Sequence, residues 1–243
     1  MPTGETAEAK PTPSRPRARK GGDALIRWML AITLLAPLVA FAGALGSRFG
    51  ALDLAVGYDL LGLRLVRILA FAGLAAALVA VLLALKRRRS LISALAALIL
   101  AGGSVGVLSW QEGRLATNAP GDVTSSPADT PPYSRLAQTT RQTAGATTVS
   151  GTAAACPGLV SIPSQVAPEK ASAALAAAGF NVVGTAPYRA EGYHEGFWYG
   201  FAHDAVIRIR PGQTDVRVTA RDDRPQGPVA CELARRIATE LAG

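Results

Sequence analysis

Histidine and cysteine, which often bind metals or carry catalysis, are scarce in this chain. It holds two of each in 243 residues. Glu191, His194 and Glu195 superficially suggest metal ligands, but no further histidine or cysteine pair completes a tetrahedral set. The cysteines form no Cys-x-x-Cys pair, so thiol redox catalysis is not expected. We therefore predict no metal site and interpret the charged cluster as a loop or strand end.

Motifs for common reactions are also lacking in the second half of the chain. Its serines concentrate at 114–155, without the Gly-x-Ser-x-Gly turn and positioned histidine that an acyl-transfer site needs. The sequence has no glycine-rich phosphate loop. No cofactor is therefore predicted, and no recognisable set of residues indicates catalysis.

Charged residues are absent from three long apolar runs, 28–46, 68–85 and 91–109. Each run has about the 20 residues that a helix needs to cross the hydrocarbon core of a bilayer. A helix buried in a soluble protein would normally carry a polar stripe over that length. The sequence therefore predicts an α-helical membrane anchor of three transmembrane helices.

Basic residues predict the orientation of this anchor, because positively charged loops stay in the cytoplasm. They cluster before the first run and again in Lys86-Arg87-Arg88-Arg89, between the second and third runs. This pattern predicts a multi-pass protein of the bacterial inner membrane, with a cytoplasmic amino terminus and a periplasmic carboxyl-terminal domain. Alternatively, the first run is a cleavable signal, since Ala40-Phe41-Ala42 fits a signal peptidase. Residues 51–66 either lie along the membrane surface or extend the second helix.

The net charge of +8 is concentrated in the first half of the chain. Residues 1–113 hold 13 basic and 6 acidic residues, a balance of +7, whereas residues 114–243 hold 12 and 11, a balance of +1. The excess accompanies the apolar runs, and the second half has no basic element interleaved with aromatic residues. We expect membrane lipids as partners and no nucleic acid.

Composition divides the chain into four segments. Residues 1–23, rich in proline and basic residues, are expected to form a disordered cytoplasmic tail. Residues 24–110 are the three-helix membrane region. Residues 111–155 are dominated by small and polar residues and are predicted to be an extended tether rather than a folded layer. Residues 156–243 are the candidate soluble domain.

Local patterns in residues 156–243 predict a small α+β domain with one antiparallel sheet and two helices on one of its faces. The first helix is expected at 168–178, where proline begins the segment and glycine follows it. The second helix is expected at 229–241. The expected strands are 180–186, 195–201, 205–210 and 214–221.

Alternation in the last two strands places Arg208, Arg210, Arg217 and Arg221 on one face of the sheet. Guanidinium groups suit carboxylates and phosphates, so this face is a candidate platform for a small anion. The alternative, which we favour, is a solvated face whose arginines pair with nearby aspartates.

Cys156 and Cys231 both lie in the half that is predicted to be periplasmic. An even number of cysteines in an oxidising compartment suggests one disulfide between the start of the domain and its last helix. Two buried thiols are the alternative.

Several motifs in the second half, taken in order, resemble one known family. They are Asp122-Val123-Thr124 through Asp129 and Pro131-Pro132-Tyr133, the stretch 200–210, Asp215-Val216-Arg217 with Arg221, and Ala234-Arg235-Arg236-Ile237. Residues 114–243 thereby resemble the domain of unknown function 1499 family. The resemblance implies a bacterial or plastid-related protein, with amino-terminal membrane helices and no established activity.

The resemblance also supplies candidate ligand-binding residues. Carried onto this sequence, the recurring polar positions of the family are Asp122, Asp129, Glu191, Asp204, Arg208, Arg217, Arg221, Arg235 and Arg236. The chain departs from the family pattern at Ala202-His203, where the family tends to have Pro and Asp, and in the turn at 222–229. These departures put a shared ligand site around this turn in doubt, and they are consistent with a degenerate or a specialised member.

Two classes of function stay open at this point. The first is an integral protein of the bacterial envelope whose periplasmic domain binds an envelope protein partner or a small anionic ligand without catalysis. The second is an envelope enzyme of unrecognised type that uses Glu191, Asp204 or His194. The sequence favours the first and predicts neither the ligand nor the oligomeric state.

Overall fold

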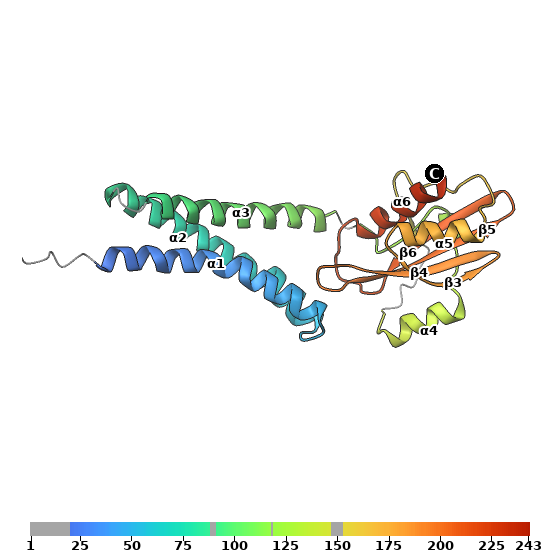
Figure 1. Cartoon of the computed structure of the whole chain (residues 1–243), viewed down its shortest axis with the longest axis horizontal. Helices are drawn as coiled ribbons and strands as arrows, with labels where there is room; N and C mark the ends of the chain where they lie inside the picture. The colour runs from blue at the N-terminus through green and yellow to red at the C-terminus, as the bar shows by residue number, and fades with distance from the viewer. Residues whose placement is uncertain (1–19, 88–90, 118, 147–152) are drawn as a thin grey trace, which may run out of the picture.

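The computed structural model describes residues 20–87, 91–117, 119–146 and 153–243. Long helices form an elongated region at one end, and a sheet domain follows at the other (Figure 1). The helices are α1 (Lys20–Arg48), η1 (Ala55–Leu65), α2 (Val66–Arg87) and α3 (Leu91–Leu115). We call these four elements the helical region and residues 119–243 the sheet domain.

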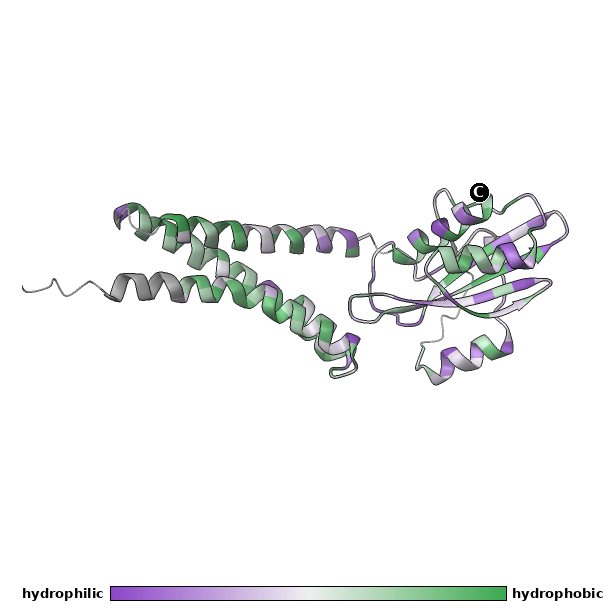
Figure 2. Cartoon of the chain, in the orientation of Figure 1, coloured by the Kyte–Doolittle hydropathy of each residue, from purple (hydrophilic) through white to green (hydrophobic). Residues whose placement is uncertain are grey.

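Three helices are long and apolar enough to cross a membrane. They are Trp28–Arg48, Ala55–Lys86 and Leu91–Leu115, with mean hydropathies of 2.1, 2.8 and 2.3. Most of their residues are hydrophobic, as the colours of Figure 2 show. The three predicted apolar runs lie within them. Of the two alternatives for 51–66, the structure shows the second, because η1 continues directly into α2.

Small residues allow α1 to approach the η1 and α2 helices closely. A Cβ atom placed on Gly43 would lie 2.6 Å from the carbonyl oxygen of Gly57, and one on Gly57 would clash with the hydroxyl of Ser47. Between α2 and α3, buried alanines such as Ala77 and Ala97 make the contact. Close approach of helix backbones through small residues is the usual packing of helices in membranes.

The sheet has six strands in the order β2-β1-β6-β5-β4-β3. Their bounds are β1 (Asp122–Thr124), β2 (Ala154–Ala155), β3 (Asn181–Ala186), β4 (Arg189–Glu195), β5 (Ala202–Arg210) and β6 (Gln213–Ala220). All neighbours are antiparallel except β1 and β2, which are parallel. The predicted α+β class is therefore right, but the sheet is mixed and has two more strands than expected.

Helices cover both faces of this sheet (Figure 1). On one face, α5 (Pro168–Ala177) and α6 (Val229–Ala242) pack against the apolar side chains of β5 and β6, with Leu175, Ile207 and Ile237 fully buried. The predicted alternation is confirmed, since Ile207 and Val218 point into this core. The other face carries α4 (Arg135–Thr143) and the short turn η2 (Pro127–Asp129), which were not predicted.

Two sequence predictions about the second half are wrong. The segment 111–155 is not a simple tether, because α3 extends to Leu115 and the segment supplies β1, η2, α4 and β2 to the fold; its residues 118 and 147–152 lie outside the described residues. The strand expected at 195–201 is instead a turn, and the strand β4 lies before it, at Arg189–Glu195. The cytoplasmic tail predicted for 1–23 lies outside the described residues up to residue 19, and Lys20–Asp23 belong to α1.

Cys156 and Cys231 are paired as the sequence suggested. Their sulfur atoms lie at bonding distance and their Cα atoms are 5.6 Å apart. The pair joins the end of β2, at the edge of the sheet, to the first turn of α6.

Candidate functional site

The face of the sheet beneath α4 and η2 carries buried carboxylates, and we call it the polar face. Asp122, Asp204, Asp215 and Glu191 expose 6% of their surface or less. They come from four different strands, and alternation along each strand directs them away from the apolar core. Buried carboxylates are stable only when cations or several hydrogen-bond donors accompany them.

Arginines supply the matching positive charge on the polar face. Arg217 forms a fork with Asp122, with Nε and Nη2 at 2.9 and 2.6 Å from the carboxylate oxygens. Arg221 forms the same fork with Asp204, at 2.9 and 2.7 Å. Arg141 of α4 reaches the same Asp204 at 2.6 Å. These bidentate pairs fix both partners in one geometry.

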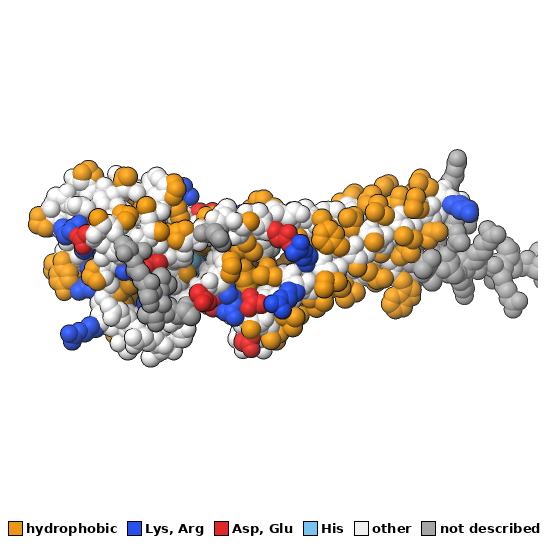
Figure 3. All heavy atoms as spheres, turned by 180° about the vertical axis from the view of Figure 1, so that it is seen from behind, with side chains coloured by type: hydrophobic (Ala, Val, Ile, Leu, Met, Phe, Trp, Pro, Cys, Tyr) orange, Lys and Arg blue, Asp and Glu red, His pale blue; other side chains and the backbone are white. Residues whose placement is uncertain are grey.

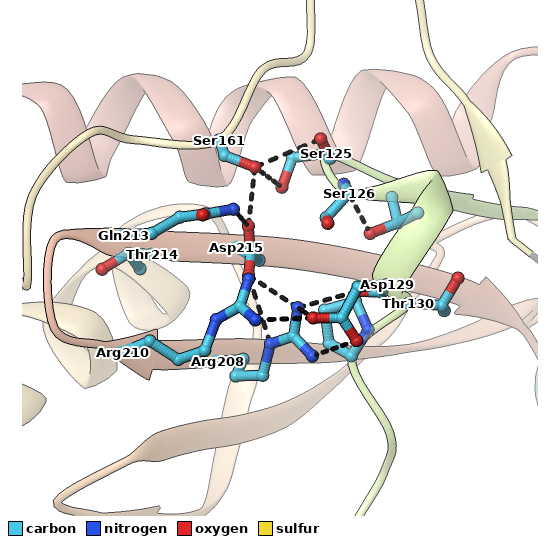
Figure 4. Close-up of polar contacts among 12 residues, drawn as sticks. Ser125, Ser126, Asp129, Thr130, Ser161, Arg208, Arg210, Gln213, Thr214 and Asp215 are labelled. Carbon is cyan, nitrogen blue, oxygen red and sulfur yellow. Dashed lines mark hydrogen bonds and ion pairs between the residues drawn. The ribbon is translucent and has the colours of Figure 1, made fainter.

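The most buried carboxylate of this face is Asp215, shown in Figure 4. It accepts hydrogen bonds from Ser161 and Gln213 on one oxygen and from Arg208 and Arg210 on the other, at 2.6 to 3.2 Å. Both guanidinium groups also bind Asp129, whose carboxylate is exposed. Asp129 thus closes the cluster from the solvent side.

Electrostatics follow from this pairing. Burial would lower the pKa of Arg217, but its bonds to Asp122 raise that pKa above the usual value. Burial would raise the pKa of Asp215, but donation from Ser161 and Arg208 lowers it below the usual value. The positive charge of the guanidinium groups on this face is therefore balanced by carboxylates of the protein itself. The pairing with aspartates agrees with the alternative that the sequence favoured, but the face is covered by α4 and η2 rather than solvated. The pairing leaves little positive charge to attract an anion.

The remaining residues that the sequence predicted to bind a ligand lie in two separate places. Glu191 accepts from the backbone nitrogen and hydroxyl of Ser134, which caps α4, so it holds this helix on the sheet. With Asp204 and Arg221 it also lines a small cavity of about 120 Å³ beneath α4. Arg235 and Arg236 are exposed on α6, across the sheet, so the structure does not bring them together with the rest.

A larger cavity of about 260 Å³ lies where β1, β5 and the turn before α6 meet the end of α3. It is lined by Leu115, Ala119, Gly121, Asp122, His203, Ala220, Asp222, Asp223, Arg224, Pro225, Gln226, Gly227 and Ala230. Of the residues proposed from sequence as ligand-binding, it includes Asp122 alone. His203 and residues 222–227 of the turn before α6 both form part of its wall.

Two buried polar atoms at this cavity lack partners among the described residues. They are Nδ1 of His203 and Oε1 of Gln226. The side chain of Gln226 is oriented by its Nε2, which donates to the backbone oxygen of Asp222 at 3.2 Å. His203 is 2% exposed. Unpaired buried polar atoms are uncommon in folded proteins. Both atoms are closed to solvent, so a ligand in the cavity would reach them only after its wall shifts.

His203 makes folding depend on pH. Burial, with a smaller contribution from His194, lowers the pKa of His203 from 6.5 to about 4. Between these values an unfolded chain binds a proton that the folded chain does not. The free energy of unfolding is therefore not reduced by this group above pH 6.5. It falls as the pH drops toward 4, by about 3 kcal/mol in all.

We expect His203→Gln to flatten this dependence. The free energy of unfolding, measured by denaturant titration of the full chain in detergent between pH 4 and 7.5, should fall less steeply with acid than in the wild-type chain. His194→Gln removes an exposed imidazole and leaves His203 in place, so it should keep most of the wild-type slope. Equal slopes in wild type and His203→Gln would contradict the argument.

Neither a cluster of metal ligands in the described residues nor a comparison with known proteins indicates a further site. In the described part of the chain, no group of three or more His, Cys, Asp or Glu side chains could hold a metal ion. The chain matches no protein-family model, no curated protein and no solved structure. Membership of the domain of unknown function 1499 family therefore stays a prediction.

Proposed function

We propose that this chain is a multi-pass protein of the bacterial inner membrane whose periplasmic sheet domain binds a small polar ligand, without catalysis, in the cavity beside His203. The observation that carries this proposal is the pair of unpartnered buried atoms, His203 Nδ1 and Gln226 Oε1, in a cavity of about 260 Å³. Small ligands usually bind in preformed cavities with a few directed polar groups.

The chemistry of the wall indicates the class of ligand. The oxygen of Gln226 can only accept a hydrogen bond, whereas Nδ1 of His203 accepts or donates according to the tautomer of the ring. Asp222 and Asp223 add carboxylates to the same wall. Arg224 lies in the same wall, but it is paired with Asp222 and Asp59, so a compound with hydroxyl or amino donors fits this cavity better than the anion predicted from sequence.

The helical region contributes to the shape of this cavity. The hydroxyl of Tyr58 in η1 donates to the backbone oxygen of Pro225 at 2.6 Å, and Arg224 bonds to Asp59 at 2.9 Å. Charged side chains gather where the two regions meet (Figure 3). The contacts with Tyr58 and Asp59 thus hold the turn at 222–227 against η1, which supports a ligand site fixed to the membrane helices.

The test uses the two histidines as internal probes. The full chain, labelled with ¹⁵N-histidine and placed in lipid nanodiscs, is titrated with glycerol, glucose, ethanolamine and inorganic phosphate. We expect a hydroxyl or amino compound to shift the imidazole resonances of His203 saturably while those of His194 stay in place. Gln226→Leu should weaken this response at least tenfold, since it removes the acceptor.

Gln138→Leu is the matched control, because Gln138 lies on α4, away from the cavity. This variant should respond as the wild-type chain does. A response to phosphate alone would restore the anion prediction. Equal shifts of both histidines, or none with any probe, would contradict a ligand site at this place.

A further inference from the structure

The turn between β4 and β5, residues 196–201, concentrates aromatic side chains and lies against the helical region. We call it the aromatic loop; its aromatic members are Phe197, Trp198, Tyr199 and Phe201. Tyr199 has a φ angle of +60°, a left-handed conformation that is strained for a bulky residue. Such a conformation persists only where surrounding contacts hold it in place.

One half of the aromatic loop is held by η1. The rings of Tyr199 and Phe201 each meet the ring of Tyr58 edge-on, with centroids 5.0 Å apart. A Cβ atom on Gly62 would collide with the hydroxyl of Tyr199, so the absence of a side chain there makes room for this ring. At the base of the loop, Glu195 forms an ion pair with Arg48 at the end of α1. These contacts fix where the rest of the loop points.

The other half of the aromatic loop lies against α1, which is an apolar helix. The ring of Trp198 lies edge-on against Phe41, with centroids 5.8 Å apart. Phe41 lies in the span Trp28–Arg48, about seven residues and so roughly 10 Å before its outer end at Arg48. Both rings are about half exposed, and Phe197 beside them is 69% exposed. The loop therefore presents bare aromatic surface at the depth of a helix that is apolar enough to cross a bilayer.

We propose that Phe197 and Trp198 insert into the lipid interface of the bilayer that the helices cross, as a fourth contact of the protein with the membrane. Phe41 belongs to an apolar helix and is 52% exposed, so in a bilayer its surroundings are lipid, and the ring that touches it shares them. Tryptophan is enriched at this depth, because its ring has an apolar body and a polar N–H. Bilayer contact also accounts for the strained conformation of Tyr199, because a relaxed turn would not hold the loop against α1.

The experiment measures the depth of Trp198 in the full chain. Trp28→Phe with Trp110→Phe leaves Trp198 as the sole tryptophan of the three. In nanodiscs, lipids brominated near the glycerol end of their chains should quench its emission at least twofold, and aqueous iodide should quench it weakly. Trp28→Phe with Trp198→Phe leaves Trp110, exposed near the outer end of α3, as a reference for interfacial depth.

Each outcome decides the proposal. Quenching of Trp198 by lipid to the extent seen for Trp110 supports insertion. Strong quenching by iodide without quenching by lipid overturns it, and so does protection from both, which would indicate cover by protein such as a second copy of the chain. If the doubly substituted chains do not fold, wild-type protein labelled with 5-fluorotryptophan gives the same comparison through paramagnetic lipids.

Discussion

Replacing Asp215 by alanine is expected to lower the free energy of unfolding by about 3–5 kcal/mol. Asp215 is fully buried and accepts hydrogen bonds from the side chains of Ser161, Gln213, Arg208 and Arg210. Its removal leaves two guanidinium groups without their buried partner, and Arg208 is itself only 16% exposed. Asp129 still pairs with both arginines from the solvent side, so the loss reflects the missing buried partner more than the strength of any one bond.

Asp129→Ala is the matched control for this prediction. Asp129 binds the same two arginines but is 57% exposed and faces solvent. Water replaces its bonds when it is removed, so a much smaller loss is expected. Denaturant titration of both variants in detergent, followed by circular dichroism, measures the difference. Similar losses in the two variants would mean that burial of the partner does not set the energy of this cluster.

Much of the fold could be predicted from sequence, because its dominant signals are local. Three uncharged apolar runs are sufficient to locate the helices that are long and apolar enough to cross a membrane. The alternation of Ile207 and Ile209 with Arg208 and Arg210 defines which face of β5 is buried, since successive side chains of a strand point to opposite faces. The arginines of the polar face were found in the same way.

The wrong predictions share a physical reason, which is that distant parts of the chain determine those structures. The segment Asp122-Val123-Thr124 is too short to show alternation, and it becomes a strand through pairing with β6 and the fork between Arg217 and Asp122. The aromatic residues after Glu195 have high strand propensity, but they contact η1 and α1 instead. Tertiary contact overrides local propensity in both segments.

The cavity beside His203 is harder still to predict. Its wall combines residues from α3, β1, β5 and the turn at 222–227, and no spacing connects His203 with Gln226. No sequence prediction pointed to it, because the departures at Ala202-His203 and in the turn at 222–229 only put a ligand site shared with the resembled family in doubt.

Loss of the bond between Cys156 and Cys231 should have the second large effect. The bond ties β2, a strand of two residues at the sheet edge, to α6, so few backbone hydrogen bonds hold this edge without it. It closes a loop with a sequence separation of 75 residues, and the double alanine variant should lose about 2–4 kcal/mol of unfolding free energy.

The single variants distinguish this bond from the alternative of two buried thiols. Either Cys156→Ala or Cys231→Ala breaks the bond completely, so each should lose nearly as much as the double variant, and reductant should lower the stability of the wild-type chain by a similar amount. Separate thiols would instead contribute by packing alone, so their losses would be small and would add. Additive losses, together with insensitivity to reductant, would therefore exclude the disulfide and weaken the placement of the sheet domain in an oxidising compartment.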